Sequence, residues 1–297
     1  MDYINLVKRS LSLTWKFKFL WFFGLFIALM SGGSGMNFNG FDMGSMPKTT
    51  QINTQNLDLK SFIDQNVIWV IIVILAVLFL IGLALWILSI ISQGALIGCA
   101  DKLDKQVKTN VKDGLIIGKK YFWRILGISL LFGLTIFLSF IILGTPVTLL
   151  FYFQLFGRAV LLLLLALLIF VPEVIFLSLI LNYALRAIVL KDNKIVESIK
   201  TAYNLLINNF WQTIVVALIF IGINLAVSIA IFMAIFLIAV PVVILILLTK
   251  AILGSILFWI CVVLAVLLLI IVSLTIKTLL ITFKYNLWTL TFKELKK

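Results

Sequence analysis

Histidine is absent from this sequence of 297 residues, and cysteine occurs only as Cys99 and Cys261. Histidine is the commonest general base and a very common metal ligand. No cysteine pair has zinc-site spacing, no glycine-rich loop follows a strand, and no Gly-x-Ser-x-Gly turn is present. We therefore expect no metal, no cofactor and no enzymatic activity. A disulfide between the two cysteines would be geometrically awkward, so we expect both to be reduced.

Charged residues are also scarce, at 12% of the chain, whereas 64% of the residues are hydrophobic. Soluble domains are typically about 25% charged and about 45–50% apolar. One soluble core cannot hide so much apolar surface, so the surrounding solvent must be lipid. Lipid allows only helices or a closed barrel, because every backbone group must be satisfied internally. The apolar runs are continuous and do not alternate with polar residues, which predicts helices.

Six apolar segments are predicted to cross the bilayer, and they are numbered here in chain order. Two further apolar stretches, 146–157 and 241–249, are too short to cross alone. The sequence leaves open whether these two stretches are half-inserted or extend the neighbouring spans. The six predicted spans are residues 17–30, 67–91, 123–143, 159–181, a fifth from Trp211 to the break at Pro241, and 252–274.

The orientation is predicted from the distribution of basic residues. All but four of the 24 Lys and Arg residues lie in the N-terminus, in two connectors (99–122, with Arg124 directly after it, and 186–210) or in the tail 276–297. Because Lys and Arg accumulate in cytoplasmic loops, both termini are predicted to be cytoplasmic. The polar stretch 31–66 then becomes an extracytoplasmic loop, either simply solvated or binding a partner. The four exceptions are Lys48, Lys60, Arg158 and Lys250.

The two connectors and the tail have apolar residues on one helical face and basic residues on another. In the first connector, Val107, Val111 and Leu115 recur every four residues. This pattern is typical of an amphipathic helix that lies on a membrane surface. Anionic lipids attract such basic segments. The predicted contacts to anionic lipids are Lys108, Lys112, Lys119, Lys120 and Arg124.

Each outward span begins at a tryptophan, namely Trp15, Trp123 or Trp211, and each follows a predicted surface helix. One interpretation is three parallel copies of a unit made of a surface helix, an outward span and an inward span. The other is that interfacial aromatic residues make all membrane spans look alike. Gly94 and Gly98 form a Gly-x-x-x-Gly pattern, which lets helices approach closely and predicts a packing seam within the bundle rather than a dimer interface.

Glu173 lies in the fourth predicted span, next to Pro172, and no Lys or Arg lies at the same predicted depth. Ionisable groups within a membrane are costly and usually face a bundle interior, a partner or water. Asn224 lies at a comparable depth in the fifth span, and Glu173 and Asn224 are the candidate intramembrane functional residues. Three interpretations stay open: a neutral carboxyl that holds the bundle together beside a proline kink, a site for protons or cations, or a group nearer an interface.

Three segments together resemble a group of uncharacterised bacterial multi-spanning proteins, similar to the membrane domain fused to some glycerophosphodiester phosphodiesterases. The segments are WKFKFLWFFGLFIALMSGG, SQGALIGCADKLD and LRAIVLKDNKIVESIKTAYNLLINNF. The resemblance implies a helical membrane domain of unknown role in a bacterial cytoplasmic membrane. The phosphodiesterase domain of those proteins, a barrel with histidines and acids, has no counterpart here, so its activity is not implied.

Together these patterns predict an all-α integral membrane protein, with residues 1–297 as one membrane domain. Six transmembrane helices form three hairpins, accompanied by amphipathic cytoplasmic surface helices. The predicted function is non-enzymatic, as a membrane scaffold or a lipid-interacting accessory protein. The alternative is a small transporter or proton-coupled carrier that uses Glu173. The expected partners are the bilayer and anionic lipids and not nucleic acid, whereas homo- and hetero-oligomers both stay open.

Overall fold

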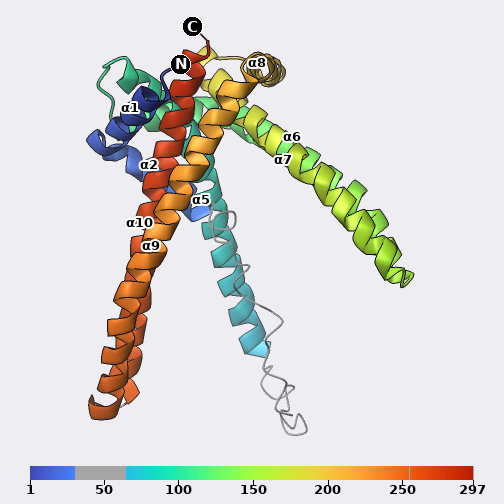
Figure 1. The fold of residues 1–297 in the computed structure, drawn as a ribbon. Helices are drawn as coiled ribbons and strands as arrows, with labels where there is room; N and C mark the ends of the chain where they lie inside the picture. The colour runs from blue at the N-terminus through green and yellow to red at the C-terminus, as the bar shows by residue number, and fades with distance from the viewer. Residues whose placement is uncertain (31–64, 254, 297) are drawn as a thin grey trace.

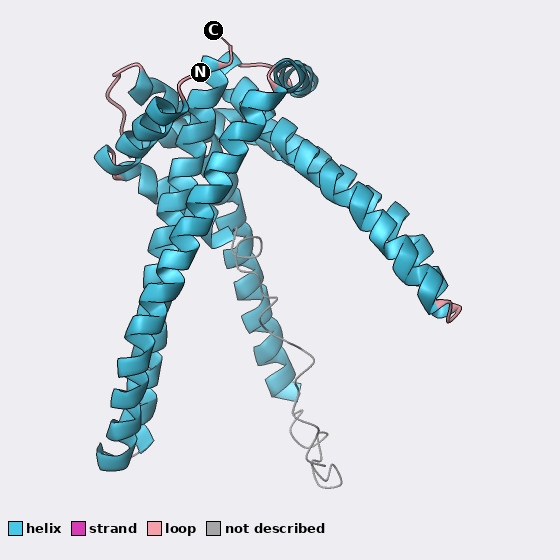
Figure 2. Ribbon diagram, in the orientation of Figure 1, coloured by secondary structure: helices cyan, strands magenta, loops and turns pink. Residues whose placement is uncertain are grey.

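The computed structural model describes residues 1–30, 65–253 and 255–296, so residues 31–64 of the predicted extracytoplasmic loop lie outside the described residues. Within these ranges the chain forms helices joined by short links, with no strand (Figure 2). This confirms the prediction of an all-α fold. The helices are α1 (Tyr3–Lys16), α2 (Phe19–Met30), α5 (Gln65–Asp104), α6 (Val111–Tyr152), α7 (Phe156–Lys191), α8 (Ile195–Asn208), α9 (Phe210–Leu253) and α10 (Ser255–Glu294).

The chain is a multi-pass membrane protein by the length and composition of these helices. Five of the described helices are long and apolar enough to cross a membrane. The bent pair of α1 and α2 brings the number to as many as six if it counts as one span. At about 1.5 Å per residue, α2 with its 12 residues is about 18 Å long, which is shorter than a hydrocarbon core of about 30 Å.

The helices form a packed head from which three legs diverge (Figure 1). The head contains both termini, α1, α2, α8 and the adjoining ends of the other helices. The legs are formed by α5, by the α6–α7 pair and by the α9–α10 pair, where these helices extend beyond the head (Figure 1). Nearly all buried side chains of the described chain lie in the head. The legs expose large apolar side chains, such as Leu168 at 71% and Phe232 at 71%. Such surfaces require lipid or a protein partner to cover them.

The first two helices meet at a sharp bend of 98°. Asp2 caps α1 by accepting a hydrogen bond from the backbone N–H of Asn5, at 3.1 Å. Across the bend, the indole of Trp21 donates to the backbone oxygen of Thr14 at 2.8 Å. Leu6 and Leu13 are buried on one face of α1, so this face packs against other helices of the head while the opposite face is exposed.

The first connector differs from the predicted surface helix over residues 99–122. Residues 99–104 complete α5, and α6 begins at Val111 and continues without a break through Trp123 to Tyr152. A capping interaction explains this start, because the backbone N–H of Asn110 donates to the carboxylate of Asp113 at 3.2 Å. Val107 therefore lies outside the helix and is 50% exposed.

The tail 276–297 also differs from a separate surface helix, because α10 runs unbroken to Glu294. The uncharged polar residues Thr278, Thr282 and Asn286 are buried in the head and form hydrogen bonds within the protein. The hydroxyl of Thr282 donates to the backbone oxygen of Thr278 at 2.8 Å. The side-chain amide of Asn286 donates to the hydroxyl of Thr14 at 3.0 Å. Because these groups find partners inside the protein, the helix does not turn toward the membrane surface.

Of the stretch 146–157, residues 146–152 extend α6, residues 153–155 form the turn and residues 156–157 begin α7, and α9 likewise includes 241–249. Proline removes one helical hydrogen bond, but neighbouring hydroxyl groups can satisfy backbone oxygens in an apolar setting. Pro146 leaves the backbone oxygen of Ile142 without its helical donor, and the hydroxyl of the adjacent Thr145 donates instead to the backbone oxygen of Ile141, at 2.6 Å. Both stretches therefore lengthen helices and do not form separate re-entrant segments.

Glycines on α5 and α6 bring these two helices into close contact in the head. A Cβ atom added to Gly94 would lie 2.9 Å from Ile125 Cδ1, and one added to Gly98 would lie 2.6 Å from Ile117 Cγ2. A Cβ atom added to Gly118 would lie only 2.2 Å from the backbone oxygen of Ile91. The two helix backbones can therefore approach as they do only because no side chain stands between them.

Candidate functional site

Glu173 lies within the α6–α7 leg and faces α6. Its carboxyl group is 2.5 Å from the hydroxyl of Ser139, which donates to it. Both side chains are partly buried, at the contact between the two helices. Pro172 lies inside α7 without ending it. The arrangement provides one polar link between two otherwise apolar helices.

Asn224 is not brought together with Glu173. It lies on α9 and lines a cavity of about 790 Å³ at the junction between the head and the α9–α10 leg. Helices α2, α5 and α7 each contribute one side chain to the wall, and α9 and α10 contribute the rest. Glu173 is not among the lining residues. The polar residues that line the cavity are Gln93, Asn224, Ser228, Ser273, Lys277, Lys284 and Tyr285.

The two lysines make this cavity cationic, because no Asp or Glu lines it. No carboxylate of the described residues forms an ion pair with Lys277 or Lys284. The ammonium group of Lys284 lies 5.8 Å from the ring centre of Phe220, which gives it a cation–π contact. Both lysines are half-buried and lack a carboxylate partner among the described residues, so the pair marks this cavity as a candidate site for an anion.

Arg186 lies behind the wall of this cavity and is fully buried. Its Nη1 atom donates to the backbone oxygen of Asn182 at 2.6 Å and to the side-chain oxygen of Asn182 at 3.3 Å. Its Nε and Nη2 atoms have no hydrogen-bond partner among the described residues. The guanidinium lies 5.3 Å from the ring centre of Tyr285, whose side chain lines the cavity. Since arginine does not lose its proton in proteins, it adds an uncompensated positive charge there.

The predicted lipid-contact lysines lie near the start of α6. Lys108, Lys112 and Lys119 are exposed and form no ion pair with the described residues. Lys120 and Arg124 instead contact Asp192 at the end of α7, at 3.2 and 2.5 Å. Hydrogen bonds from Lys120 and Arg124 lower the pKa of Asp192 below its usual value.

A second ion-pair cluster connects α1, α5 and α10 in the head. Lys293 contacts Asp101 at 2.9 Å and Asp104 at 2.6 Å, and Arg9 also pairs with Asp104. The side chain of Asp104 is only 6% exposed. Both acids therefore serve as structural links, and no group of three or more potential metal ligands occurs in the described ranges.

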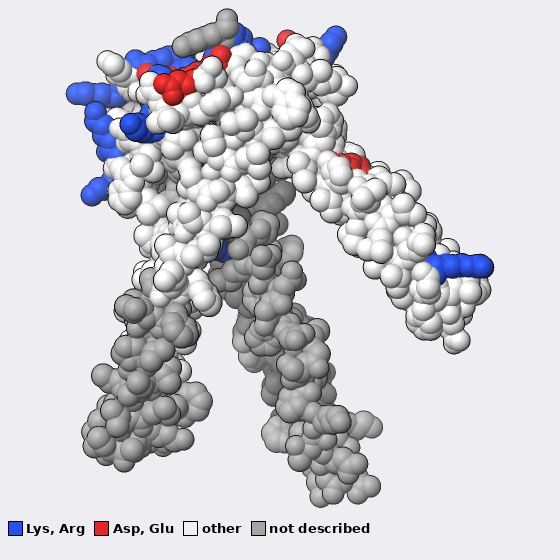
Figure 3. All heavy atoms as spheres, viewed as in Figure 1, with Lys and Arg blue, Asp and Glu red and all other residues white. Residues whose placement is uncertain are grey.

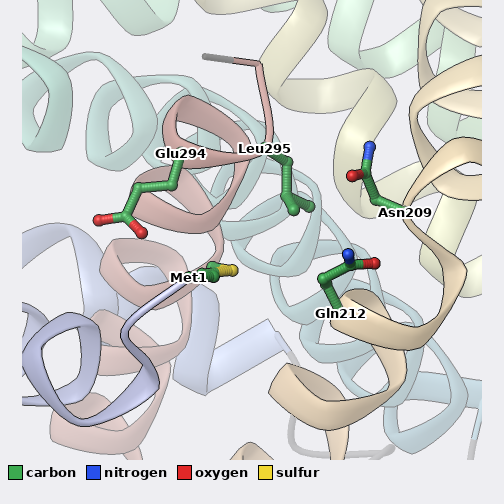
Figure 4. Close-up of a pocket in the computed structure, with 5 residues that line it drawn as sticks. All are labelled: Met1, Asn209, Gln212, Glu294 and Leu295. Carbon is green, nitrogen blue, oxygen red and sulfur yellow. The ribbon is translucent and has the colours of Figure 1, made fainter.

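A smaller cavity of about 460 Å³ lies between the two termini and the start of α9. Asn209 and Gln212 lie on one side of it and Glu294 on the other, with Met1 and Leu295 between them (Figure 4). This cavity contains one carboxylate and no lysine or arginine. It therefore offers less to an anion than the cavity lined by Lys277 and Lys284.

Comparison with known families matches residues 7–292 to a family of unknown function, DUF7544. The chain belongs to that family. No curated protein and no solved structure matches it. The match thus covers almost the whole chain, including the residues of the cationic cavity, but the family has no assigned activity.

Lys277, Lys284 and Arg186 were absent from the residues predicted to be functional. A tail with basic residues suggested a surface helix, so its lysines were expected in water. One signal was available: Ser273, Lys277 and Lys284 recur at intervals of four and seven residues, which places them on one helical face. The burial of Arg186 had no comparable signal, because it depends on α10 packing beside α7.

Proposed function

We propose that the protein is a non-enzymatic membrane protein that binds anionic lipids through its head, as a scaffold or a lipid-interacting accessory protein. The observation that carries this proposal is the segregation of charge. On the face seen in Figure 3, the described basic side chains gather on the head and the described surface of the legs is largely uncharged. Between Arg124 and Arg186 the sequence contains only Arg158 and Glu173 as charged residues.

The exposed lysines near the start of α6 support the lipid part of the proposal. Lys108, Lys112 and Lys119 form no ion pair with the described residues, so their ammonium groups are available to phosphate. They lie on the head, beside apolar legs that need a lipid environment. A basic residue close to an anionic membrane surface contributes about 1 kcal/mol to the attraction.

Purified protein would be titrated with phosphatidylglycerol and with phosphatidylcholine of identical acyl chains, and bound lipid counted by native mass spectrometry. We expect preferential binding of phosphatidylglycerol, and weakening by about 125-fold, which is about fivefold per lysine, in the triple variant Lys108→Gln, Lys112→Gln, Lys119→Gln. The matched control Lys48→Gln, Lys60→Gln, Arg158→Gln removes the same charge from the side predicted to be extracytoplasmic. Equal loss in both variants would contradict binding through the head.

The topology that accompanies this proposal has six spans in three hairpins, with both termini in the cytoplasm of a bacterial cell. The position of the N- and C-termini at the same end of the molecule supports an even number of crossings (Figure 1). Cysteines introduced by Ser45→Cys and by Lys296→Cys would be labelled with a membrane-impermeant maleimide on intact spheroplasts. We expect labelling at position 45 only, and labelling at position 296 would reverse the proposed orientation.

The alternative function is a small proton-coupled carrier, and the partly buried contact between Glu173 and Ser139 is the observation that favours it. A carrier needs a route for water or substrate to Glu173. Neither of the two cavities described above is lined by Glu173. Proteoliposomes containing a pH-sensitive dye would test this function. Proton flux that is lost in Glu173→Gln, with folding intact, would favour the carrier over the lipid-binding protein.

A further inference from the structure

We infer that the cavity between α9 and α10 binds the phosphate group of an anionic ligand, held by Lys277 and Lys284. The inference rests on the proposed function, because it gives an anionic lipid one defined site in addition to the exposed lysines. The cavity volume of about 790 Å³ lies within the range of about 300–1,000 Å³ that is common for small-ligand sites.

The cavity is built from two helix faces that oppose each other. On α10, Ser273, Lys277 and Lys284 follow the helical repeat and line the same cavity. On α9, Asn224 and Ser228 are one turn apart and also line it. At about 1.5 Å per residue, Lys277 and Lys284 are separated by about 10 Å along the helix axis. A ligand between these faces therefore meets two ammonium groups from one side and neutral polar groups from the other.

The charge of the cavity requires an anion to balance it. Neither lysine has a carboxylate partner among the described residues, and no acid lines the cavity. The cation–π contact of Lys284 with Phe220 leaves its three N–H donors free for an acceptor. Three positive charges occur together once Arg186 is included. Such a concentration is costly in an apolar setting unless an anion accompanies it.

Arg186 contributes from behind the wall and does not itself line the cavity. Two of its three nitrogens lack hydrogen-bond partners, although the residue is fully buried. It is held in place by Asn182 on its own helix and by the ring of Tyr285. Tyr285 lies between the Arg186 guanidinium and the cavity. The positive charge of Arg186 therefore strengthens the attraction of the cavity for an anion, although Arg186 does not contact that anion. Arg186 is therefore a positioning residue for the charge and not a ligand contact.

The remaining walls favour a phosphate group that carries acyl chains. Ile27, Leu181 and Phe232 line the cavity and are apolar. Below them the legs expose large aliphatic side chains, which suit the tails of a lipid. Basic pockets between transmembrane helices on the cytoplasmic side are typical sites for lipid head groups. Free inorganic phosphate shares the head-group chemistry but would leave the apolar walls uncovered.

The experiment uses the full-length protein, delipidated in detergent and titrated separately with dioleoyl phosphatidylglycerol, dioleoyl phosphatidylcholine and inorganic phosphate. We expect one phosphatidylglycerol to bind more tightly than the rest, and Lys277→Gln with Lys284→Gln to weaken that site about 25-fold, which is about fivefold per lysine. The double variant Lys194→Gln, Lys200→Gln removes the same charge from exposed positions on the head and should retain the tight site. Lys277→Arg with Lys284→Arg should bind like the wild type.

The outcomes distinguish a lipid head group from free inorganic phosphate as the ligand. They also distinguish failure of the proposed function from failure of the inference about the cavity. Binding of inorganic phosphate with the same dependence on Lys277 and Lys284 supports the site with a soluble anion as its ligand. Equal binding of the two lipids by the wild type, without phosphate binding, overturns the inference. Wild-type affinity in a folded Lys277→Gln, Lys284→Gln variant also overturns it. If only the variant at Lys108, Lys112 and Lys119 loses lipid binding, the proposed function stands and the inference about the cavity fails. If only the variant at Lys277 and Lys284 loses lipid binding, the cavity is supported and the three exposed lysines are not lipid contacts.

Discussion

Substitution of Gly118 by alanine should weaken the contact between α5 and α6, because the new Cβ atom would lie 2.2 Å from the backbone oxygen of Ile91. That oxygen belongs to the α5 backbone and cannot rotate away, so α5 must shift. Overpacking of this kind costs typically about 1–3 kcal/mol, and a backbone obstacle places Gly118→Ala near the upper end. Alanine recovers at most about 1 kcal/mol of helix propensity. We therefore expect a net loss of about 2 kcal/mol in the free energy of unfolding.

Gly133→Ala is the matched control, because Gly133 lies in the same helix with no atom within 4 Å of the added Cβ. It gains the same propensity without the clash and should be neutral or slightly stabilising. Unfolding by SDS in mixed micelles, followed by circular dichroism, would measure both variants. Equal stability of Gly118→Ala and Gly133→Ala would refute the close contact between α5 and α6. A loss in both would mean that added methyl groups disturb α6 for another reason.

Three further substitutions test other contacts. Ser139→Ala removes the hydroxyl that donates to Glu173 and should lower stability by about 0.6–1.7 kcal/mol in the same SDS assay, as intramembrane hydrogen bonds do; no loss would mean that the two groups do not meet. Asp104→Asn weakens a nearly buried pair with Lys293 and should cost more than the roughly 1 kcal/mol of a surface pair but less than the roughly 3–5 kcal/mol of a fully buried one. Asp192→Asn should lower thermal stability slightly at neutral pH. Because the folded pKa of Asp192 is lowered, its contribution is present above its unfolded pKa and is lost as the pH falls through the folded value; a difference between wild type and Asp192→Asn that persists in stronger acid would contradict the ion pair.

The helical membrane character could be predicted because long apolar runs leave no other structure in lipid. Helix ends were harder to predict, because the same residues can lie on a membrane or inside a protein. Lys112 and Lys119 suggested a surface helix, yet the neighbouring Gly114 and Gly118 are buried, and the cap at Asn110 starts α6 there. In the tail, the side chains of Thr282 and Asn286 form hydrogen bonds inside the protein and do not contact water.

The candidate site was predicted only in part, for a related reason. Asn224 could be selected as a polar residue in an apolar span, and it lines the cationic cavity. Glu173 was selected by the same rule, but it meets Ser139 on the adjacent helix instead. The depth of a residue in the membrane can be predicted from the sequence, but this depth does not show which faces of two helices meet. Lys277 and Arg186 acquire their setting from packing between α7, α9 and α10, which only the structure provides.

The position of α10 in the head has a consequence for biosynthesis. The hydrogen bond between Asn286 and Thr14 joins residues that are 272 positions apart. Leu287 packs in the same cluster as Leu20 and Phe23, near the beginning of the chain. During translation, α1 and α2 are therefore made long before α10, on which both pack, exists. The head can close only after the last turns of α10 have left the ribosome, so a nascent chain that ends before α10 leaves α1 without the helix it mainly packs on and α2 packed mainly on α5.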